Sequence, residues 1–471
     1  MYTIHIVNFC QVFFSVHLFF TILFFWRLSE NSTYGYNKNM RRLHEKRHQI
    51  WYKLDLSANV YPTLQRKNFS NVYRISLSLK ENIQPDILQK ALDMTLSRFP
   101  TFQVALRKGL FWRYLEANHR PGPFVQKDIE NPCMPMHFKA NNRYLIRIYY
   151  YEKRISLEVF HSLSDGAGTL YFLKTLTAVY LRLLGHDIPN GEGVLDITET
   201  PDPEEFEDAY LRYASSKIGR PRSQGNAYRV RGTKEPFYTL NIICGVIPVD
   251  KLRVISKGYG VTITEYLNAV LLYALLQKQK AEKPFHERPV TLAMPVNLRS
   301  FFPSKTLRNF ISMVYPSIDP RMGDYTFEEI LQHVHHYMRY YINPKFLNAD
   351  IVTNASVQQN PLIRIVPLFI KDFTVRKFYA NVQDGQSSAG LTNVGLTKLP
   401  KEMLPFVERF DVLMGQPFSA RTNCAIISYQ NILTVNFTSS IKETDIERYF
   451  FRKLVQDGIP VKIETNRKME D

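Results

Sequence analysis

The chain has 471 residues, of which 45% are hydrophobic and 22% are charged. This length allows several domains of ordinary size or one large fold built from two halves. The composition excludes a chain that is disordered along its length and a protein with many membrane spans. The four cysteines, Cys10, Cys133, Cys244 and Cys424, lie far apart, so the sequence predicts neither a disulfide framework nor a cysteine zinc site. We therefore expect a globular protein of the reducing cytoplasm.

The formal net charge of +17 indicates anionic partners. Coenzyme A, an acidic carrier protein, an anionic membrane or nucleic acid would each satisfy this charge, and solubility alone is an equal alternative. The basic residues form only short clusters, such as Arg41 with Arg42 and Lys46 with Arg47. They lack the repeated basic and aromatic spacing of a nucleic-acid groove, so we expect no nucleic-acid partner.

The first 39 residues differ in composition from the rest of the chain. Residues 4–26 are predominantly apolar and long enough to cross a bilayer. The segment lacks the basic start and the small-residue cleavage site of a secretory signal. Two interpretations stay open, a membrane anchor or an over-extended translation start, and the second is favoured because a basic, globular-looking stretch begins at Met40. We expect membrane contact only if the anchor is real.

From Met40 onward the sequence alternates strands and amphipathic helices. Residues 72–79 alternate as in a strand, and residues 85–99 place apolar side chains at helical spacing. Residues 155–161 alternate so that the apolar face of the strand also carries His161, and a helix is predicted at residues 169–184. Shorter strands are predicted at residues 102–106, 111–115 and 144–150.

Residues 185–234 are rich in Pro, Gly and charged residues, which is typical of a crossover between halves. The second half has predicted strands at residues 238–247, 289–296, 310–318, 391–395, 410–414, 424–429 and 432–437. Its predicted helices span residues 249–257, 264–279, 327–341 and 444–456. We divide the chain into residues 1–39, a first half at 40–190, a crossover at 191–235 and a second half at 236–471. Two mixed α/β sandwiches side by side are the expected architecture.

The sequence HSLSDG at residues 161–166 is an HxxxDG motif between the predicted strand and the next helix. A histidine on an apolar strand face is desolvated, which favours the neutral imidazole that accepts a proton near pH 7. We expect His161 to be a general base; the alternative is a buried structural histidine. Asp165 can hold the turn by pairing with a cation, and Gly166 and Gly168 allow the backbone to turn tightly into the helix.

No GxSxG sequence occurs in the chain, so we expect no serine nucleophile and no acyl-enzyme. Ser162 and Ser164 lie beside the histidine and are expected to support the loop. The backbone amides around Gly166 are candidates to hold a developing oxyanion.

Two other groups of histidines are candidate metal ligands. Residues 44–48 fit HExxH, but Lys46 and Arg47 add positive charge beside the metal and spoil the apolar packing of such a helix. His333, His335 and His336 lie on different faces of the predicted helix. We expect no metal site.

Together with the HxxxDG motif, the stretches MPVNLR at 294–299, RNF at 308–310 and LTNVG at 391–395 resemble the chloramphenicol acetyltransferase-like acyltransferases. That superfamily includes peptide-synthetase condensation domains, and the chain most resembles its stand-alone bacterial alcohol acetyltransferases. The resemblance covers residues 51–463. It implies two α/β sandwich halves with an active-site channel between them.

The resemblance also implies roles for individual residues. Thr392 and Asn393 are expected to line the substrate channel. Relatives pair their motif aspartate with an arginine from the second half, so we expect Arg299 to pair with Asp165, with Arg308 as the reserve choice.

The implied activity is transfer of an acyl group, most simply acetyl, from a thioester such as acyl-CoA to a small-molecule alcohol. Acyl-CoA would be a co-substrate, and no bound cofactor is expected. Phe160 stands where condensation domains carry the first histidine of HHxxxDG, which disfavours peptide-bond formation, and no DFGWG of the plant acyltransferases follows. Amide formation with an acyl carrier protein as donor and a catalytically silent binding protein stay open as alternatives.

Overall fold

The computed structural model describes residues 51–55, 57–65, 70–214, 226–236, 239–282, 287–381, 386–415 and 421–467. Residues Tyr52–Asp471 form one compact unit. The first 39 residues, for which an anchor or an over-extended start is expected, lie outside the described residues, as does the HExxH stretch at 44–48. Within the described ranges no single helix passes as a membrane span by length and apolarity, and one pair of consecutive helices, bent by 82°, passes only when taken together.

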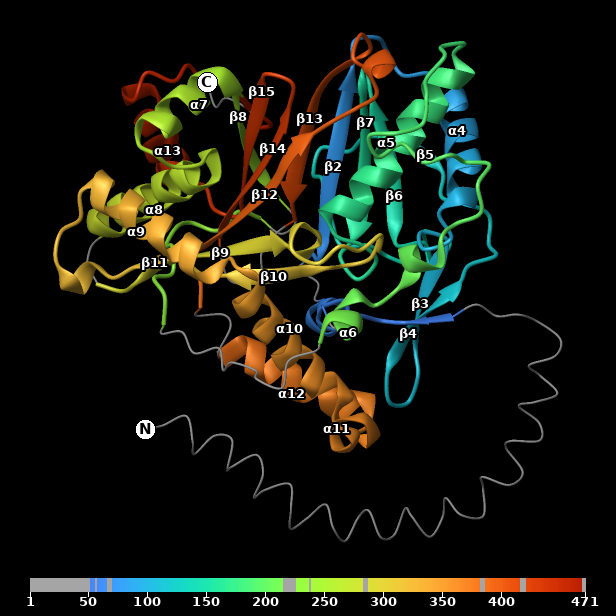
Figure 1. Cartoon of the computed structure of the whole chain (residues 1–471), viewed down its shortest axis with the longest axis horizontal. Helices are drawn as coiled ribbons and strands as arrows, with labels where there is room; N and C mark the ends of the chain where they lie inside the picture. The colour runs from blue at the N-terminus through green and yellow to red at the C-terminus, as the bar shows by residue number, and fades with distance from the viewer. Residues whose placement is uncertain are drawn as a thin grey trace, which may run out of the picture. The chain divides into compact units, whose positions relative to one another are not determined.

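The first lobe is built on a five-stranded sheet in the order β13-β2-β7-β6-β5 (Figure 1). Its strands are β2 (Val72–Leu79), β5 (Val125–Lys127), β6 (Ile146–Tyr151), β7 (Arg154–Phe160) and β13 (Val407–Met414). Helices α4 (Pro85–Arg98) and α5 (Gly166–Leu183) cover one face of this sheet. Ile155, Leu157 and Val159 of β7 are fully buried in the core under these helices, as their alternation predicts.

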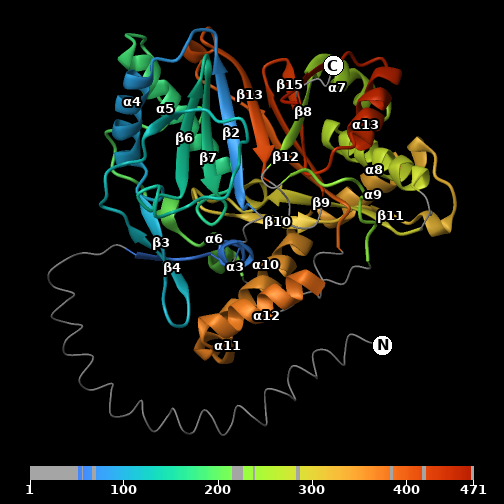
Figure 2. The same cartoon turned by 180° about the vertical axis from the view of Figure 1, so that it is seen from behind.

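The second lobe is built on an eight-stranded sheet in the order β10-β9-β12-β14-β15-β8-β16, with β11 also paired to β9. Its strands are β8 (Asn241–Pro248), β9 (Val290–Asn297), β10 (Ile311–Val314), β11 (Ser317–Ile318), β12 (Ala389–Thr397), β14 (Thr422–Tyr429), β15 (Ile432–Ser439) and β16 (Lys462–Thr465). Helices α7 (Val249–Gly258), α8 (Ile263–Ala281), α9 (Phe327–Tyr341) and α13 (Asp445–Gln456) lie together on one side of it (Figure 2). The structure thus has the two-lobed mixed α/β architecture that the sequence predicts.

Smaller elements connect or flank the lobes. A three-stranded sheet has the order β1-β4-β3, with β1 (Trp51–Lys53), β3 (Val104–Lys108) and β4 (Arg113–Ala117). The short helices are α3 (Val60–Leu64), α6 (Ala209–Tyr213) and the 3-10 turns Pro203–Phe206, Leu298–Ser300, Pro320–Met322 and Lys401–Met403. The predicted crossover is therefore not purely irregular: α6 lies in it, and Tyr210 of α6 is buried and donates a hydrogen bond to Ile311 O at 2.8 Å.

The second half of the sequence, predicted at residues 236–471, contributes the strand β13 to the sheet of the first lobe. This strand comes from the second half of the sequence but pairs antiparallel with β2, so that Phe410 lies opposite Leu77 in the sheet of the first lobe. Val407, Phe410 and Val412 are buried in the same core cluster as β2 and β7. The alternation of apolar residues in a strand predicts which face is buried but does not identify the neighbouring strand. The pairing of β13 with β2 therefore could not be predicted from the sequence.

Residues 344–381 form three helices that no sequence pattern predicts: α10 (Pro344–Gln359), α11 (Pro361–Ile365) and α12 (Leu368–Asn381). Helices are predicted from apolar residues that repeat on one face. In α11 and α12 large apolar side chains such as Leu362, Phe369 and Phe373 are exposed instead. The periodic signal is therefore missing.

Candidate active site

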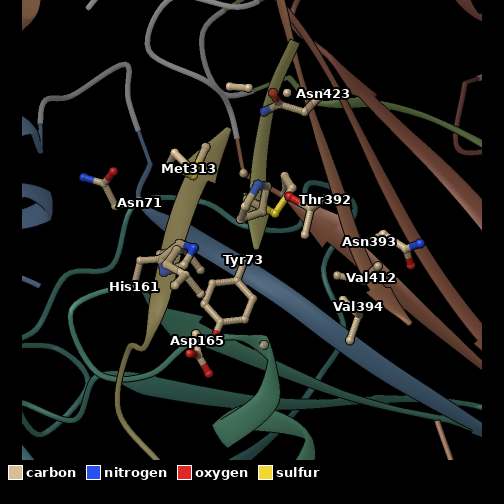
Figure 3. A pocket seen from close by; sticks show the side chains of 18 of the residues that line it. Asn71, Tyr73, His161, Asp165, Met313, Thr392, Asn393, Val394, Val412 and Asn423 are labelled. Carbon is tan, nitrogen blue, oxygen red and sulfur yellow. The ribbon is translucent and has the colours of Figure 1, made fainter. Parts of the chain in front are cut away.

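A cavity of about 410 Å³ lies between the two lobes and is lined by residues of both (Figure 3). The first lobe contributes Tyr73 and His161, and the second contributes Met313 and Thr392. Val412 of β13 also lines it. Because the lining comes from both lobes, the geometry of the cavity depends on how the lobes are held together.

His161 directly follows β7 and is partly buried at the cavity wall. Its backbone N–H donates to Asn71 O at 2.8 Å, and its carbonyl accepts from Asn309 Nδ2 at 3.0 Å. The imidazole stacks on Tyr61, with ring centroids 4.6 Å apart, and also contacts Tyr73, at 4.5 Å. These contacts on the backbone and on the ring faces fix the position of the imidazole.

The environment of the ring favours its neutral form. Burial lowers the pKa of His161 to about 4, although Asp165, the Asn309 side chain and the His161 carbonyl act in the opposite direction. Nδ1 is buried and makes no hydrogen bond to any described residue, and the side chain lines the cavity. The ring can therefore accept a proton from a bound molecule at neutral pH.

Asp165 is the N-cap of α5 and is buried. Its Oδ1 accepts the Gly168 N–H at 3.1 Å, which satisfies one of the free amides at the helix start. Its Oδ2 accepts from the Phe310 backbone N–H at 2.9 Å and from Arg299 at 2.7 Å. The carboxylate therefore ties the motif loop to two segments of the second lobe, and all three contacts orient it away from a proton-transfer role.

The Asp165–Arg299 ion pair expected from the resemblance is present. The guanidinium of Arg299 also donates to the backbone carbonyls of Thr306, at 2.9 Å, and Arg308, at 2.6 Å. The reserve choice, Arg308, pairs with Asp55 at 3.5 Å instead of with Asp165. Arg299 is thus held in place by its own lobe and presented to the carboxylate of the other.

The two glycines of the motif region have different roles. A Cβ at Gly166 would contact only Val394 Cγ2, at an ordinary 3.8 Å. A Cβ at Gly168 would collide with the Leu307 carbonyl and with Ser164 Oγ. The close approach that requires a glycine is therefore at Gly168, where α5 meets the second lobe, and Gly166 only lines the cavity.

The serines beside the histidine support the loop, in agreement with the prediction. Ser162 Oγ donates to Ala58 O at 2.9 Å, and Ser164 Oγ donates to Leu307 O at 2.6 Å. Both serines are buried. Each hydroxyl is occupied, so neither is positioned as a nucleophile.

Thr392 and Asn393 both line the cavity, as the resemblance implies for a channel. Figure 3 shows the Thr392 side chain directed into the cavity and the Asn393 amide directed away from it. That amide donates to Thr264 Oγ1 at 2.8 Å and accepts the Gly395 N–H at 2.9 Å. Thr392 is therefore able to contact a ligand, whereas Asn393 shapes the irregular end of β12.

Several residues of the site were not predicted from the sequence. Tyr61, Tyr73, Asn71 and Asn309 surround His161, yet they come from α3, β2 and two loops. Tyr73 lies on the apolar face of the predicted strand, so the sequence predicts a buried core residue there and not a residue of the site. Only Asn309 lies in a stretch that the resemblance includes, and its distance along the sequence from the motif does not indicate that it contacts His161.

The other histidine group has a surface location. His335 lies on α9, with Nδ1 3.3 Å from Glu265 Oε2. Burial lowers the pKa of His333 on the same helix. Among the residues that the structure describes, no group of three or more His, Cys, Asp or Glu side chains could hold a metal ion.

Solved structures share this fold over most of the chain. The trichothecene 15-O-acetyltransferase TRI3 from Fusarium sporotrichioides has a TM-score of 0.55 at 13% identity, covering 87% of this chain and 94% of that chain. TRI101 of F. sporotrichioides, complexed with coenzyme A and T-2, has a TM-score of 0.57 at 11% identity, covering 89% and 100%. The first condensation domain of the calcium-dependent antibiotic synthetase has a TM-score of 0.57 at 14% identity, covering 88% and 99%.

No protein-family model matches the chain, and no curated protein sequence is significantly similar to it. The similarity to the solved structures lies in the arrangement of both lobes, because identity is at most 14% in these three. The chain therefore has the two-lobed fold of these acetyltransferases and of this condensation domain.

Proposed function

We propose that the protein transfers an acyl group from a thioester donor, acyl-CoA, to the hydroxyl of a small, uncharged acceptor. The observation that carries this proposal is the position of His161, which lines a cavity between two lobes whose fold is shared with acetyltransferases, and burial lowers its pKa. The net charge of +17 supports a donor with phosphate groups. Acetyl is the simplest acyl group for such a cavity.

His161 is the general base of the proposed reaction. Nε2 takes the proton of the acceptor hydroxyl while the oxygen attacks the thioester carbonyl carbon. The C–O bond forms, the C–S bond of the tetrahedral intermediate breaks, and the proton passes to the departing thiolate. No acyl-enzyme is needed, which agrees with the occupied hydroxyls of Ser162 and Ser164.

The start of α5 is suited to the charge that develops on the carbonyl oxygen. Gly166 and Ala167 line the cavity at the first two positions of the helix. Their backbone N–H groups donate to no carbonyl within the helix, because the first amides of a helix have no preceding turn to bond. We assign these two amides to the oxyanion, where the positive end of the helix adds to their effect.

The lining of the cavity restricts the acceptor. Asp165 is the only carboxylate among the described lining residues, and it is paired with Arg299. The same lining has no lysine or arginine. An acceptor that enters this cavity therefore meets apolar groups, such as Met313 and Val412, and neutral polar ones, such as Thr392 and Asn423. A charged acceptor would lose its hydration without gaining an ionic partner.

Amide formation with a carrier-protein donor is the less supported alternative. Phe160 occupies the first histidine position of the condensation-domain motif, and here it is fully buried against Phe138 at a centroid distance of 5.1 Å. It cannot reach the cavity or hold a proton. The single histidine leaves ester formation as the favoured reaction.

The proposal is tested with the purified chain, a series of acyl-CoAs from acetyl to octanoyl, and a panel of primary alcohols. We expect free thiol to be released only when acceptor is present, with the matching ester detected by mass spectrometry. Thiol release without acceptor would identify a thioesterase instead. An absence of ester with every donor, including an acyl carrier protein, would contradict the proposal.

A further inference from the structure

Large apolar side chains are exposed together at the tip of the β3–β4 hairpin and on α11 and α12. We call this surface the α11–α12 patch, and it consists of Leu110, Trp112, Leu362, Ile363, Ile365, Phe369 and Phe373. Phe369 and Phe373 are 70% and 68% exposed, and Leu110 is 68% exposed. An apolar surface of this kind on a folded protein marks a site of interaction.

The hairpin and the helices are in direct contact, so the patch is continuous. The Leu368 N–H donates to Leu110 O at 2.8 Å, and Lys371 Nζ donates to Phe111 O at 2.9 Å. Both views of the fold show α11 and α12 projecting from the body of the protein, with the β3–β4 hairpin beside them (Figures 1 and 2).

The exposure of the phenylalanines does not come from a loosely attached helix. On its inner side, Asp372 of α12 pairs with Arg113 and accepts from Thr63 Oγ1 at 3.0 Å. Phe369 and Phe373 are four residues apart, so they lie one above the other on one side of the helix. The buried ion pair at Arg113 therefore fixes a helix that presents its phenylalanines to solvent.

The surroundings of the patch are basic. Residues 361–377 contain four basic residues and a single acidic one, Asp372, which is already paired. The hairpin tip at residues 107–113 adds Lys108, whereas its other two basic residues are paired, Arg107 with Glu116 and Arg113 with Asp372. Burial lowers the pKa of Lys53, and the nearby Arg364 lowers it further, while Asp208 acts in the opposite direction. Burial also lowers the pKa of Lys371, and Lys53 adds to this effect. Among these basic residues only Arg107 and Arg113 have a carboxylate partner within the described part of the chain, so the surface keeps a positive charge that suits an anionic partner.

We propose that the α11–α12 patch docks the protein on an anionic phospholipid membrane. Phe369, Phe373 and Trp112 would enter the boundary between headgroups and acyl chains, while the flanking lysines and arginines contact the lipid phosphates. A bilayer has anionic headgroups at its surface and apolar chains below them. Aromatic side chains that protrude beyond flanking basic residues match this order, because the aromatic groups reach the apolar layer while the basic groups stay at the headgroups. The inference does not depend on the proposed catalytic function.

The test measures hydrogen exchange of the full chain with and without vesicles of about 30% phosphatidylglycerol in phosphatidylcholine, which supply the anionic surface. Exchange at residues 107–113 and 361–377 is expected to slow severalfold with these vesicles and to stay unchanged with pure phosphatidylcholine. The double variant Phe369→Ser/Phe373→Ser should bind the anionic vesicles about tenfold or more weakly, because two buried aromatic side chains are lost. Phe124→Ser, at a phenylalanine that is 60% exposed beside β5, is the matched control and should bind as the parent does.

Three results would overturn the proposal. In the first, the chain binds vesicles but exchange in the patch does not slow, so another part of the chain makes the contact. In the second, exchange in the patch is already slow without lipid, so the chain itself or a second copy covers it. In the third, neutral vesicles slow exchange as much as anionic ones, or the double variant binds as well as Phe124→Ser.

Discussion

At the scale of single residues, the lowered pKa of His161 predicts how the rate of acyl transfer depends on pH. A base must be neutral, so the rate falls where the ring becomes protonated, and the pKa of about 4 moves that fall well below the ordinary histidine range. We predict that kcat/KM for acyl transfer stays nearly constant from pH 8 to pH 5.5. An imidazole with an unshifted pKa near 6.5 would lose about tenfold over the same interval.

Circular dichroism at each pH provides the control, since acid unfolding would also abolish activity. A tenfold loss of kcat/KM at pH 5.5 with an intact spectrum would show that the ring titrates normally, and that burial does not determine its protonation in solution.

The two glycines give a second prediction at this scale. Gly168→Ala places a methyl group against the Leu307 carbonyl and Ser164 Oγ, so it should destabilise the protein by about 1–3 kcal/mol. Gly166→Ala is the matched control, because its Cβ has an ordinary contact, and it should change the free energy of unfolding by less than about 0.5 kcal/mol. Denaturant titration measures both. Equal effects would contradict the assignment of the close approach to Gly168.

At the scale of elements, the pair Asp165–Arg299 joins the start of α5 to the end of β9, across the two lobes. Both side chains are largely buried, with exposures of 4% and 13%. We predict that Arg299→Ala lowers the free energy of unfolding by about 3–5 kcal/mol, since it leaves a buried carboxylate without its cation. Part of this loss reflects the Thr306 and Arg308 carbonyls that the guanidinium also binds.

A double-mutant cycle with Asp165→Asn isolates the pair itself. We expect a coupling energy above about 1 kcal/mol between Asp165 and Arg299, and a value near zero between Asp165 and Arg308, whose carboxylate partner is Asp55. Additive effects at Asp165 and Arg299 would mean that the ion pair does not hold the lobes together.

The sequence predicts elements well where one face is buried. The helix Phe327–Tyr341 and the strand Val72–Leu79 have the predicted limits, because their apolar residues repeat with the period of the element. The pattern fails in α12, where Phe369 and Phe373 face solvent, and it cannot identify β2 as the partner of β13. In the site, the motif and the resemblance locate His161, Asp165 and Arg299, whereas the ring of Tyr61 reaches His161 only through tertiary packing.

At the scale of the whole molecule, every described residue that lines the cavity lies within the compact unit Tyr52–Asp471. We therefore predict that a chain that lacks residues 1–39 keeps kcat/KM within about threefold of the full chain, because none of the described lining residues lies in this segment. Acceptor-dependent thiol release measures this. A truncated chain that is soluble and folded but inactive would show that the first residues contribute to the site.

The lobes meet at the cavity, where the exchanged strand β13, the Asp165–Arg299 pair and the close packing at Gly168 all join them. These contacts between the lobes form the cavity that the imidazole of His161 lines. His161 is the proposed base for acyl transfer in that space.

The most direct measurement is acyl transfer by His161→Ala, with circular dichroism and thermal unfolding to verify the fold. We expect a folded protein whose kcat is lower by about two to four orders of magnitude, the usual effect of one positioned general base. Asn71→Ala is a useful comparison, since it removes a side chain of the cavity wall but not the base. A folded His161→Ala protein with near-normal turnover would show that His161 is not the base.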